Sequence, residues 1–145
     1  SPGEEDAMLF RECLCFQLAS LSRSISRSYR ERIAPYGLTQ AQFFMLIALY
    51  EEDGVLPSRL AEKTHLDRPT VTGLIDRLER DGWVARRLDP EDRRSLRVFL
   101  TPKALEHRQA LLAVYDEVNG FFLQKFSPEE WQRFQDFLNR LRGEE

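Results

Sequence analysis

The stretch that decides the fold is residues 57–82, which read PSRLAEKTHLDRPTVTGLIDRLERDG. Pro57 opens a short helix at a first-turn position, where the missing N–H of proline costs no hydrogen bond, and this helix is expected to end near Thr64. A second helix follows after a tight turn, with Asp67 as its N-cap and Gly82 as the glycine that ends it. Two helices joined in this way predict a helix-turn-helix.

The second helix, Arg68–Asp81, has two distinct faces. Its apolar residues follow the i, i+3, i+4, i+7 pattern of a helix with one buried side: Val71, Leu74, Ile75 and Leu78. The opposite face is polar and carries Arg68, Thr72, Asp76, Arg77 and Arg80. Because the second helix of a helix-turn-helix enters the major groove of duplex DNA, we interpret this segment as a reading helix.

After Gly82 the apolar period changes from that of a helix to that of a strand. Trp83–Leu88 and Leu96–Leu100 are predicted to be strands, because apolar residues alternate along the second of them. The polar run Asp89–Arg94 lies between them and is expected to form the tip of a hairpin. A helix-turn-helix followed by a charged hairpin is a winged helix-turn-helix.

Longer helices are predicted on both sides of this module. Their expected ranges are Glu5–Ile33, Thr39–Asp53, Pro102–Lys125 and Ser127–Gly143. On the helix from Pro102, the residues expected to face inward are Leu105, Leu112, Tyr115, Val118 and Phe122. The predicted fold class is therefore mainly α with a small β-hairpin, a winged helix-turn-helix with N- and C-terminal dimerisation helices.

The flanking helices carry more large apolar residues than so small a module needs. These residues are Leu9, Phe10, Phe121, Phe122, Phe126, Trp131, Phe134 and Phe137. A two-fold homodimer would give them a surface to bury against, whereas packing on their own module is the alternative. We predict a helical dimerisation region made of residues 1–35 and 102–145, around a DNA-binding domain of residues 36–101.

Composition favours a cytoplasmic, nucleic-acid-binding protein without a cofactor. The 145-residue chain has a net charge of −3, yet residues 57–100 hold ten Lys/Arg and eight Asp/Glu, and contact with phosphate depends on such local charge.

No apolar run could span a membrane, and the acidic start does not resemble a signal peptide, so we expect no membrane contact. Cys13 and Cys15 have neither disulfide nor zinc spacing, while His65 and His107 are too scattered for a metal site.

Polar residues of both helices are expected to contact duplex DNA. These candidates are Ser58, Arg59, Arg68, Thr70, Thr72 and Arg77. Arg68 is expected to recognise a guanine, because a guanidinium can bond O6 and N7 together. The two threonines suit base edges or phosphates, and the other three residues suit the DNA backbone.

Arginines also gather at the predicted hairpin tip. Arg93, Arg94 and Arg97 follow closely on Glu91 and Asp92, and arginines on a hairpin can enter a narrow minor groove. Asp92 lies two residues before Arg94, so we expect its carboxylate to aim that guanidinium. An exposed ion pair without a specific role is the alternative.

Four runs occur in order along the chain: LDRPTVT at 66–72, LERDGWV at 78–84, DPEDRR at 89–94 and VFLT at 98–101. Together they resemble the MarR family of transcriptional regulators, including its Asp-x-Arg wing pattern at Asp92 and Arg94. The resemblance covers nearly the whole chain. It implies a homodimer on a pseudo-palindromic operator, usually a repressor, that is released when a small molecule or an oxidant reaches the region between the dimer helices and the reading heads.

The segment Leu14-Cys15-Phe16 resembles the sensing segment of the organic-hydroperoxide regulators of that family. There the equivalent cysteine is oxidised and tyrosine hydroxyls stabilise its thiolate. Tyr29 matches one of these tyrosines, whereas Ala19 and Gln40 stand where the others are expected. The alternative is that Cys15 is a small core residue.

A small aromatic or anionic ligand is the rival signal. Its pocket is expected to be lined by Phe16, Ser20, Phe43, Phe44 and Ile47, with a basic group such as Arg23 or Arg27. The alternative is that these same side chains belong to the core, where such residues are found more often.

Other functional classes find little support. The glycines are scattered singly, and no nucleophile elbow or zinc-ligand cluster marks an enzyme. A winged helix can also be a protein-interaction module, but that function predicts apolar residues on the exposed face of Arg68–Asp81 and no arginine-rich hairpin.

Overall fold

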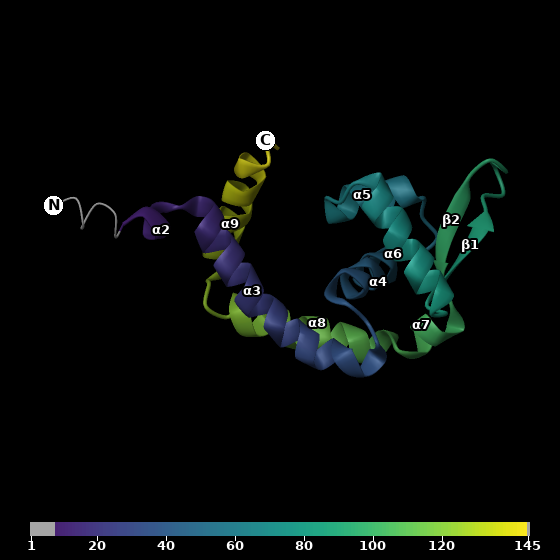
Figure 1. The fold of residues 1–145 in the computed structure, drawn as a ribbon, viewed down its shortest axis with the longest axis horizontal. Helices are drawn as coiled ribbons and strands as arrows, with labels where there is room; N and C mark the ends of the chain where they lie inside the picture. The colour runs from purple at the N-terminus through teal and green to yellow at the C-terminus, as the bar shows by residue number, and fades with distance from the viewer. Residues whose placement is uncertain (1–7, 145) are drawn as a thin grey trace.

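The computed structural model describes residues 8–144. In chain order the elements are α2 (Leu9–Glu12), α3 (Leu14–Ile33), the 3₁₀ turn η1 (Ala34–Tyr36), α4 (Gln40–Glu51), α5 (Pro57–Thr64), α6 (Arg68–Arg80), β1 (Val84–Leu88), β2 (Leu96–Leu100), α7 (Pro102–Glu106), α8 (Arg108–Leu123) and α9 (Pro128–Leu141). Helices α3 and α8 lie side by side and connect the compact module of α4 to β2 with the end that carries α2 and α9 (Figure 1). The predicted fold class, mainly helical with a small hairpin, is confirmed.

The N-caps expected from the sequence are formed at the starts of α4, α6 and α9. Asp67 Oδ1 accepts the backbone N–H of Thr70 at 2.7 Å at the start of α6. Thr39 and Gln42 form the reciprocal capping box of α4, and Ser127 and Glu130 form that of α9. Each cap satisfies amides that the first helical turn leaves without a partner, so these boundaries are set locally.

The core of the module lies between α4, α5, α6 and the hairpin. Its fully buried side chains include Phe43, Leu46, Leu49, Leu60, Ile75, Leu78 and Val98. The apolar stripe of α6 therefore faces this core, as its period predicts, and the polar stripe is left in solvent. At the end of α6, Gly82 has φ 82°, which is the left-handed conformation that glycine adopts most easily.

The hairpin is antiparallel and its register places Val84 opposite Leu100 and Leu88 opposite Leu96. The N–H of Val98 also donates to the carbonyl oxygen of Val55 at 2.8 Å, which joins β2 to the segment before α5. The wing is thus attached to the helix-turn-helix by backbone bonds as well as by its own ladder.

The single N-terminal helix predicted over Glu5–Ile33 is wrong in its described part. The backbone is extended at Cys13, with φ −85° and ψ 109°, and this residue separates α2 from α3. The Cys13 Sγ accepts the N–H of Phe16 at 3.4 Å, so the cysteine starts a new helix as its N-cap. The predicted start at Glu5 lies outside the described residues.

The helix predicted from Pro102 is also interrupted, at His107. The His107 ring packs edge-on against Trp83 and Tyr36, with centroids 5.4 and 5.7 Å apart, which ties this turn to the module before α8 continues along α3. As a result Ala104 is buried and Leu105 is 52% exposed, so the prediction that Leu105 faces inward is wrong.

Large apolar side chains remain in solvent at the far end. They include Leu9, Phe10, Leu14, Leu18, Leu21, Phe121, Phe126, Phe137 and Leu141. Within residues 8–144, none of the helices has both the length and the apolar character that crossing a bilayer requires.

Candidate nucleic-acid interface

The polar face of α6 is exposed to solvent. Arg68, Thr70, Thr72 and Arg77 are all exposed, while Val71 on the opposite face is completely buried. Because the buried stripe holds α6 on the core, the exposed stripe has a fixed direction. Its later turns contact the wing, where Asp76 and Glu79 accept hydrogen bonds from Arg86 of β1.

Residues of the reading helix and of the wing line one open hollow of about 420 Å³. Its lining residues come from α5, α6 and both strands of the wing and include Ser58, Arg68, Thr72, Arg86 and Arg94. Four residues that were predicted from three separate segments thus share one surface, namely Ser58, Arg68, Thr72 and Arg94. This surface is concave and carries three arginines.

Arg86 belongs to this surface although the sequence interpretation did not single it out. Its guanidinium donates to Glu79 Oε1 at 2.9 Å and to Asp76 Oδ1, and its backbone N–H donates to Glu79 Oε2 at 3.0 Å. These bonds clamp α6 to β1. The sequence does indicate such a role, because Asp76 and Glu79 lie three positions apart on the exposed stripe of α6 and two neighbouring carboxylates favour a basic partner.

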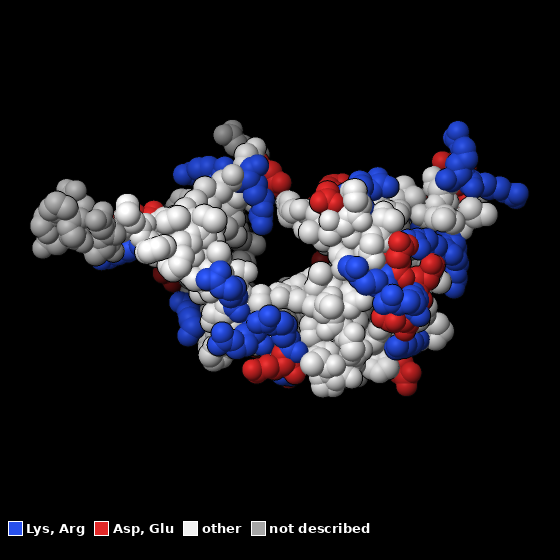
Figure 2. All heavy atoms as spheres, in the orientation of Figure 1, with Lys and Arg blue, Asp and Glu red and all other residues white. Residues whose placement is uncertain are grey.

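The tip of the wing is organised around Asp92. Its Oδ1 accepts the backbone N–H of Arg94 at 3.1 Å and the Arg94 Nε at 3.2 Å, and its Oδ2 accepts the Ser95 hydroxyl at 3.1 Å. The backbone bond from Arg94, followed by the side-chain bonds, lowers the pKa of Asp92. The Arg94 side chain is 93% exposed, so it is held at its base and free at its end, and basic side chains project from this tip (Figure 2).

Arg97 does not join the arginines of the tip. Its Nε donates to Asp89 Oδ2 at 3.0 Å and its guanidinium also donates to the carbonyl oxygen of Gly54 at 3.0 Å. Asp89 is itself only 8% exposed, and its other oxygen accepts the N–H of Glu91. The expectation that Arg97 clusters with Arg93 and Arg94 is therefore wrong, because this pair fixes the base of the wing.

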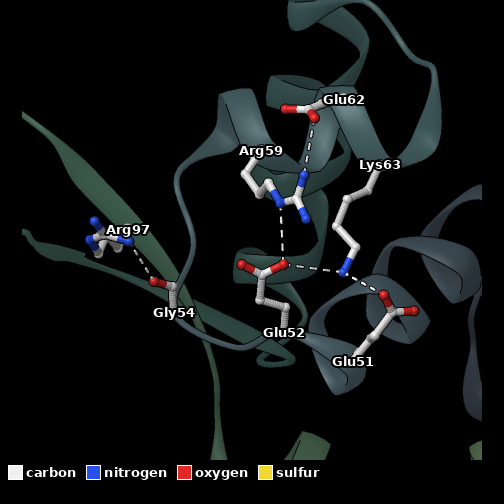
Figure 3. A network of polar contacts seen from close by, with 7 residues as sticks. All are labelled: Glu51, Glu52, Gly54, Arg59, Glu62, Lys63 and Arg97. Carbon is white, nitrogen blue, oxygen red and sulfur yellow. Dashed lines mark hydrogen bonds and ion pairs between the residues drawn. The ribbon is translucent and has the colours of Figure 1, made fainter.

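Arg59 is exposed in the first turn of α5 but its guanidinium is already engaged. It donates to Glu52 Oε2 at 3.2 Å and to Glu62 Oε1 at 3.1 Å (Figure 3). Two carboxylates therefore compete with phosphate for this side chain. Ser58, next to it, is exposed and has no such competitor among the described residues.

The six candidate sensing residues fall into two separate groups. Cys15 and Phe16 are exposed in the first turn of α3, and Ser20 is half-buried one turn further on. Tyr29 is 14 positions beyond Cys15 on the same helix, which corresponds to about 21 Å along the helix axis. Within one chain the structure therefore does not bring the thiol and the phenol together.

Tyr29 packs instead in the core beside Phe43 and Phe44, with ring centroids 5.7 and 5.1 Å away. Burial raises the pKa of Tyr29 to about 12. Phe43 is fully buried, so the expected pocket of Phe16, Ser20 and Phe43 is not formed within the chain. The hollow in this region is lined by Phe44 and Ile47 together with residues around the end of α5.

The sequence model of the MarR family matches residues 38–96, from the start of the module into the wing. The transcriptional regulator SarZ of Staphylococcus haemolyticus is 30% identical over 105 residues, which are 72% of this chain and 71% of that protein. The chain belongs to the MarR family. The regulator TtmR of Methylorubrum extorquens is 35% identical over 70% of this chain, although the match spans only about half of TtmR, 52%.

Other MarR-family similarities extend over nearly the whole chain. The organic hydroperoxide resistance transcriptional regulator of Bacillus subtilis is 26% identical over 94% of this chain and 91% of that protein. A probable transcriptional regulator from Pseudomonas aeruginosa has a TM-score of 0.78 at 29% identity, over 90% of this chain and 98% of its own. CouR of Rhodococcus jostii, solved with p-coumaroyl-CoA, has a TM-score of 0.80 at 25% identity, over 91% and 93%.

These relatives are named as regulators and the matched region is the winged helix-turn-helix. This MarR-family chain is a DNA-binding transcriptional regulator and not an enzyme.

Proposed function

We propose that the chain acts as a homodimeric repressor that binds a pseudo-palindromic operator and leaves it when a small molecule binds. The observation that carries the DNA-binding part is the hollow shared by Ser58, Arg68, Thr72 and Arg94. A surface that is concave, positively charged and built from a helix and a hairpin suits the edge of a duplex, where one groove receives the helix and the next receives the wing.

Within this surface the residues have different roles. Arg68 reads a guanine in the major groove, and Thr70 and Thr72 contact neighbouring base edges or phosphates. Arg77, further along α6, contacts phosphate. Arg93 and Arg94 enter the minor groove, and Asp92 orients Arg94 by the two bonds that it accepts from it. Arg59 contributes least, since Glu52 and Glu62 hold it.

The homodimer is supported by the apolar surface at the far end of the chain. Leu14, Leu21, Phe121 and Leu141 are each more than half exposed, and a concentration of large exposed apolar residues is typical of an interface. Residues 1–35 and 102–145 are the proposed dimerisation region. In a two-fold dimer the two modules of residues 36–101 would read the two halves of one operator.

Binding to the DNA upstream of the protein's own gene tests this function. Fluorescence anisotropy should show tight binding to one site and at least about a thousandfold weaker binding to a shuffled duplex of equal length. Light scattering on the same sample should give the mass of two chains. Equal affinity for both duplexes, or a monomer on DNA, contradicts the proposal.

Release by oxidation of Cys15 is a second candidate, and a specific observation favours it. Cys15 is exposed and free, and the full-length relative from Bacillus subtilis is named an organic hydroperoxide resistance regulator. In the proposed step the Cys15 thiolate attacks the terminal oxygen of an organic hydroperoxide, the S–O bond forms as the O–O bond breaks, and a sulfenic acid results. The remaining alkoxide leaves and takes a proton from water to become the alcohol.

Cys13 provides the matched control for this step, because it is also exposed and free. Cumene hydroperoxide should release DNA from the wild type and from Cys13→Ser but not from Cys15→Ser. Equal release from Cys15→Ser excludes Cys15 as the sensor.

A further inference from the structure

Two segments of the described chain connect the module of α4 to β2 with the long helices α3 and α8. Residues 34–39, which include the turn η1, lead from α3 into α4, and α7 leads from β2 to α8 (Figure 1). The two segments meet, because the rings of Tyr36 and His107 have their centroids 5.7 Å apart. The direction in which the module points from the long helices is therefore decided in this small region.

Helix α7 is fixed to the module. The Tyr50 hydroxyl of α4 donates to the carbonyl oxygen of Ala104 at 2.5 Å. The Lys103 ammonium donates at 2.8 Å to the carbonyl oxygen of Asp81, the C-cap of α6, and lies 4.5 Å from the centroid of the Trp83 ring. Because these partners belong to α4 and to the end of α6, α7 moves with the module.

His107 is the residue between α7 and α8, and its half-buried ring contacts both connecting segments. The ring packs edge-on against Trp83, which follows α6, and against Tyr36, the last residue of η1. Its Nδ1 lies 2.8 Å from the carbonyl oxygen of Lys103. Since a carbonyl oxygen can only accept, Nδ1 donates in this bond, and the ring is held in one orientation between the module and the segment that comes from α3.

The module also contacts α3 through an aromatic cluster, in which Tyr29 packs against Phe43 and Phe44. Tyr29 and Phe43 are buried, so their truncation would damage the core. His107 and Tyr36 are only half-buried, so their substitution leaves the core in place. The His107 contact is therefore the one whose effect on orientation can be separated from its effect on stability.

The reading end of α6 lies far from this contact. The helix has 13 residues, which corresponds to about 20 Å, and Lys103 bonds the residue that ends it. A rotation of about 10° at His107 would therefore move Arg68 by up to roughly 3.5 Å, close to the ~3.4 Å rise of one base pair. In a two-fold dimer both reading helices move, so the distance between them responds strongly to this angle.

We propose that His107 is a positioning residue for operator recognition: its ring fixes the angle between the module and α8, and this angle sets the half-site spacing that the dimer accepts. This inference rests on the proposed function, since it takes two modules of a homodimer to bind one operator. Without the ring contacts the module adopts a range of angles. The fraction of dimers that fits the preferred spacing then falls, and the fraction that fits other spacings rises.

Operators lengthened or shortened by one or two base pairs between their half-sites test this role. The wild type should bind one spacing at least about tenfold more tightly than the others, because one added base pair also turns the half-site by roughly 35° around the duplex. If about one His107→Ala dimer in ten still has the fitting angle, that spacing should be bound roughly tenfold more weakly and all spacings within about threefold of one another. A duplex with a single half-site should bind this variant and the wild type equally.

His107→Phe is the conservative variant, because it keeps a ring at both edge-on contacts, and it should keep the wild-type spacing preference. Tyr36→Leu removes the partner ring and should flatten the preference as His107→Ala does, so the test stands even where one variant folds poorly. Glu106→Ala, at the exposed neighbouring position, should have no effect. Circular dichroism and sedimentation check that each variant is folded and dimeric.

A folded His107→Ala dimer that keeps the wild-type spacing preference overturns the proposal. An equal loss of affinity at every spacing and on the single half-site also overturns it, because the ring would then only stabilise the module. A wild type that binds the single half-site as tightly as the full operator contradicts the proposed function itself, and the inference with it. The wild-type titrations alone therefore distinguish the two failures.

Discussion

The module of α4 to β2 and the first half of α3 are built in opposite ways. In the module, apolar stripes are buried within the chain and the polar side chains that matter are held by partners close in sequence or space, as Asp92 holds Arg94. In the first half of α3, Leu14, Leu18 and Leu21 are 40–53% exposed. The module buries its apolar residues within a single chain, whereas the first half of α3 leaves its leucines exposed.

This difference decides which features of the molecule can be understood from one chain alone. The direction of the reading helix and wing follows from the fold of one chain. The environment of Cys15 depends on whatever covers the exposed stripe of α3, which in the proposed homodimer is a second copy. The exposed end of α3 can therefore change without altering how α6 and the wing are held.

The largest expected effect is on the module's own stability. Leu78 is fully buried, so Leu78→Ala should lower the free energy of unfolding by about 2–5 kcal/mol through lost burial and the cavity left behind. Denaturant unfolding followed by circular dichroism measures it. If the module's core is formed within one chain, this loss of stability is the same at low and at high protein concentration. A loss that varies with concentration would show that the module's core depends on the partner chain.

A charge in the exposed stripe of α3 should separate the protomers instead. Leu18→Glu would bury an unpaired carboxylate in the proposed interface, which costs on the order of 2 kcal/mol or more and raises the dimer dissociation constant at least about thirtyfold. Analytical ultracentrifugation reads this directly. Arg23→Glu, at an exposed position on the side of the helix opposite the stripe, should leave the dimer intact, and a dimer that tolerates Leu18→Glu places the interface elsewhere.

Removing the wing arginine should weaken DNA binding without changing assembly. Arg94→Ala removes a charged donor, and such hydrogen bonds contribute about 1.5–3 kcal/mol, so the operator dissociation constant should rise by roughly ten- to a hundredfold. Anisotropy titration measures the change. Arg133→Ala, an exposed arginine on α9, is the matched control, and equal losses in both variants would show only a general effect of charge.

Arg68→Ala should act on sequence preference more than on total affinity. If Arg68 bonds a guanine through two donors, its loss costs about 1–3 kcal/mol at that base pair and little at others. Competition with operators changed one base pair at a time will show it. A uniform loss at every position would mean that Arg68 contacts phosphate.

The same contrast explains what the sequence could predict. The caps at Thr39 and Asp67, the apolar stripe of α6 and the two strands depend on residues a few positions apart, and local spacing predicted them correctly. The break at His107 could not be predicted in this way, because its ring packs against Trp83, 24 positions away in the sequence. The break at Cys13 depends on a contact as short as that of Asp67, but its acceptor is a cysteine sulfur, and cysteine is not among the usual N-cap residues.

The candidate site divides similarly. The Asp92–Arg94 contact spans two residues and was expected, whereas the roles of Arg86 and Arg97 depend on partners seven to 43 positions away and were missed or misread. The separation of Cys15 from Tyr29 within the chain follows from helix geometry, and only a partner chain could bring them close. Local signals therefore describe how the molecule reads DNA better than how it is switched.

The smallest expected effect concerns the carboxylate that aims the wing. Hydrogen bonds from the Arg94 N–H and side chain lower the pKa of Asp92, so the ion is preferred in the folded wing. A group of this kind contributes fully above its ordinary pKa, near 3.9, and its contribution is lost as pH falls through the lowered folded value. Operator affinity between pH 5 and 8 should therefore not change through Asp92.

Asp92→Asn keeps an acceptor but removes the charge, and it should weaken operator binding only a few-fold. Glu91→Gln should have no effect, because Glu91 is exposed and its carboxylate has no bond to Arg94. A loss in Asp92→Asn as large as that in Arg94→Ala would mean that the carboxylate holds the whole tip in place, and the wing would then be less complete on its own than the core beneath it.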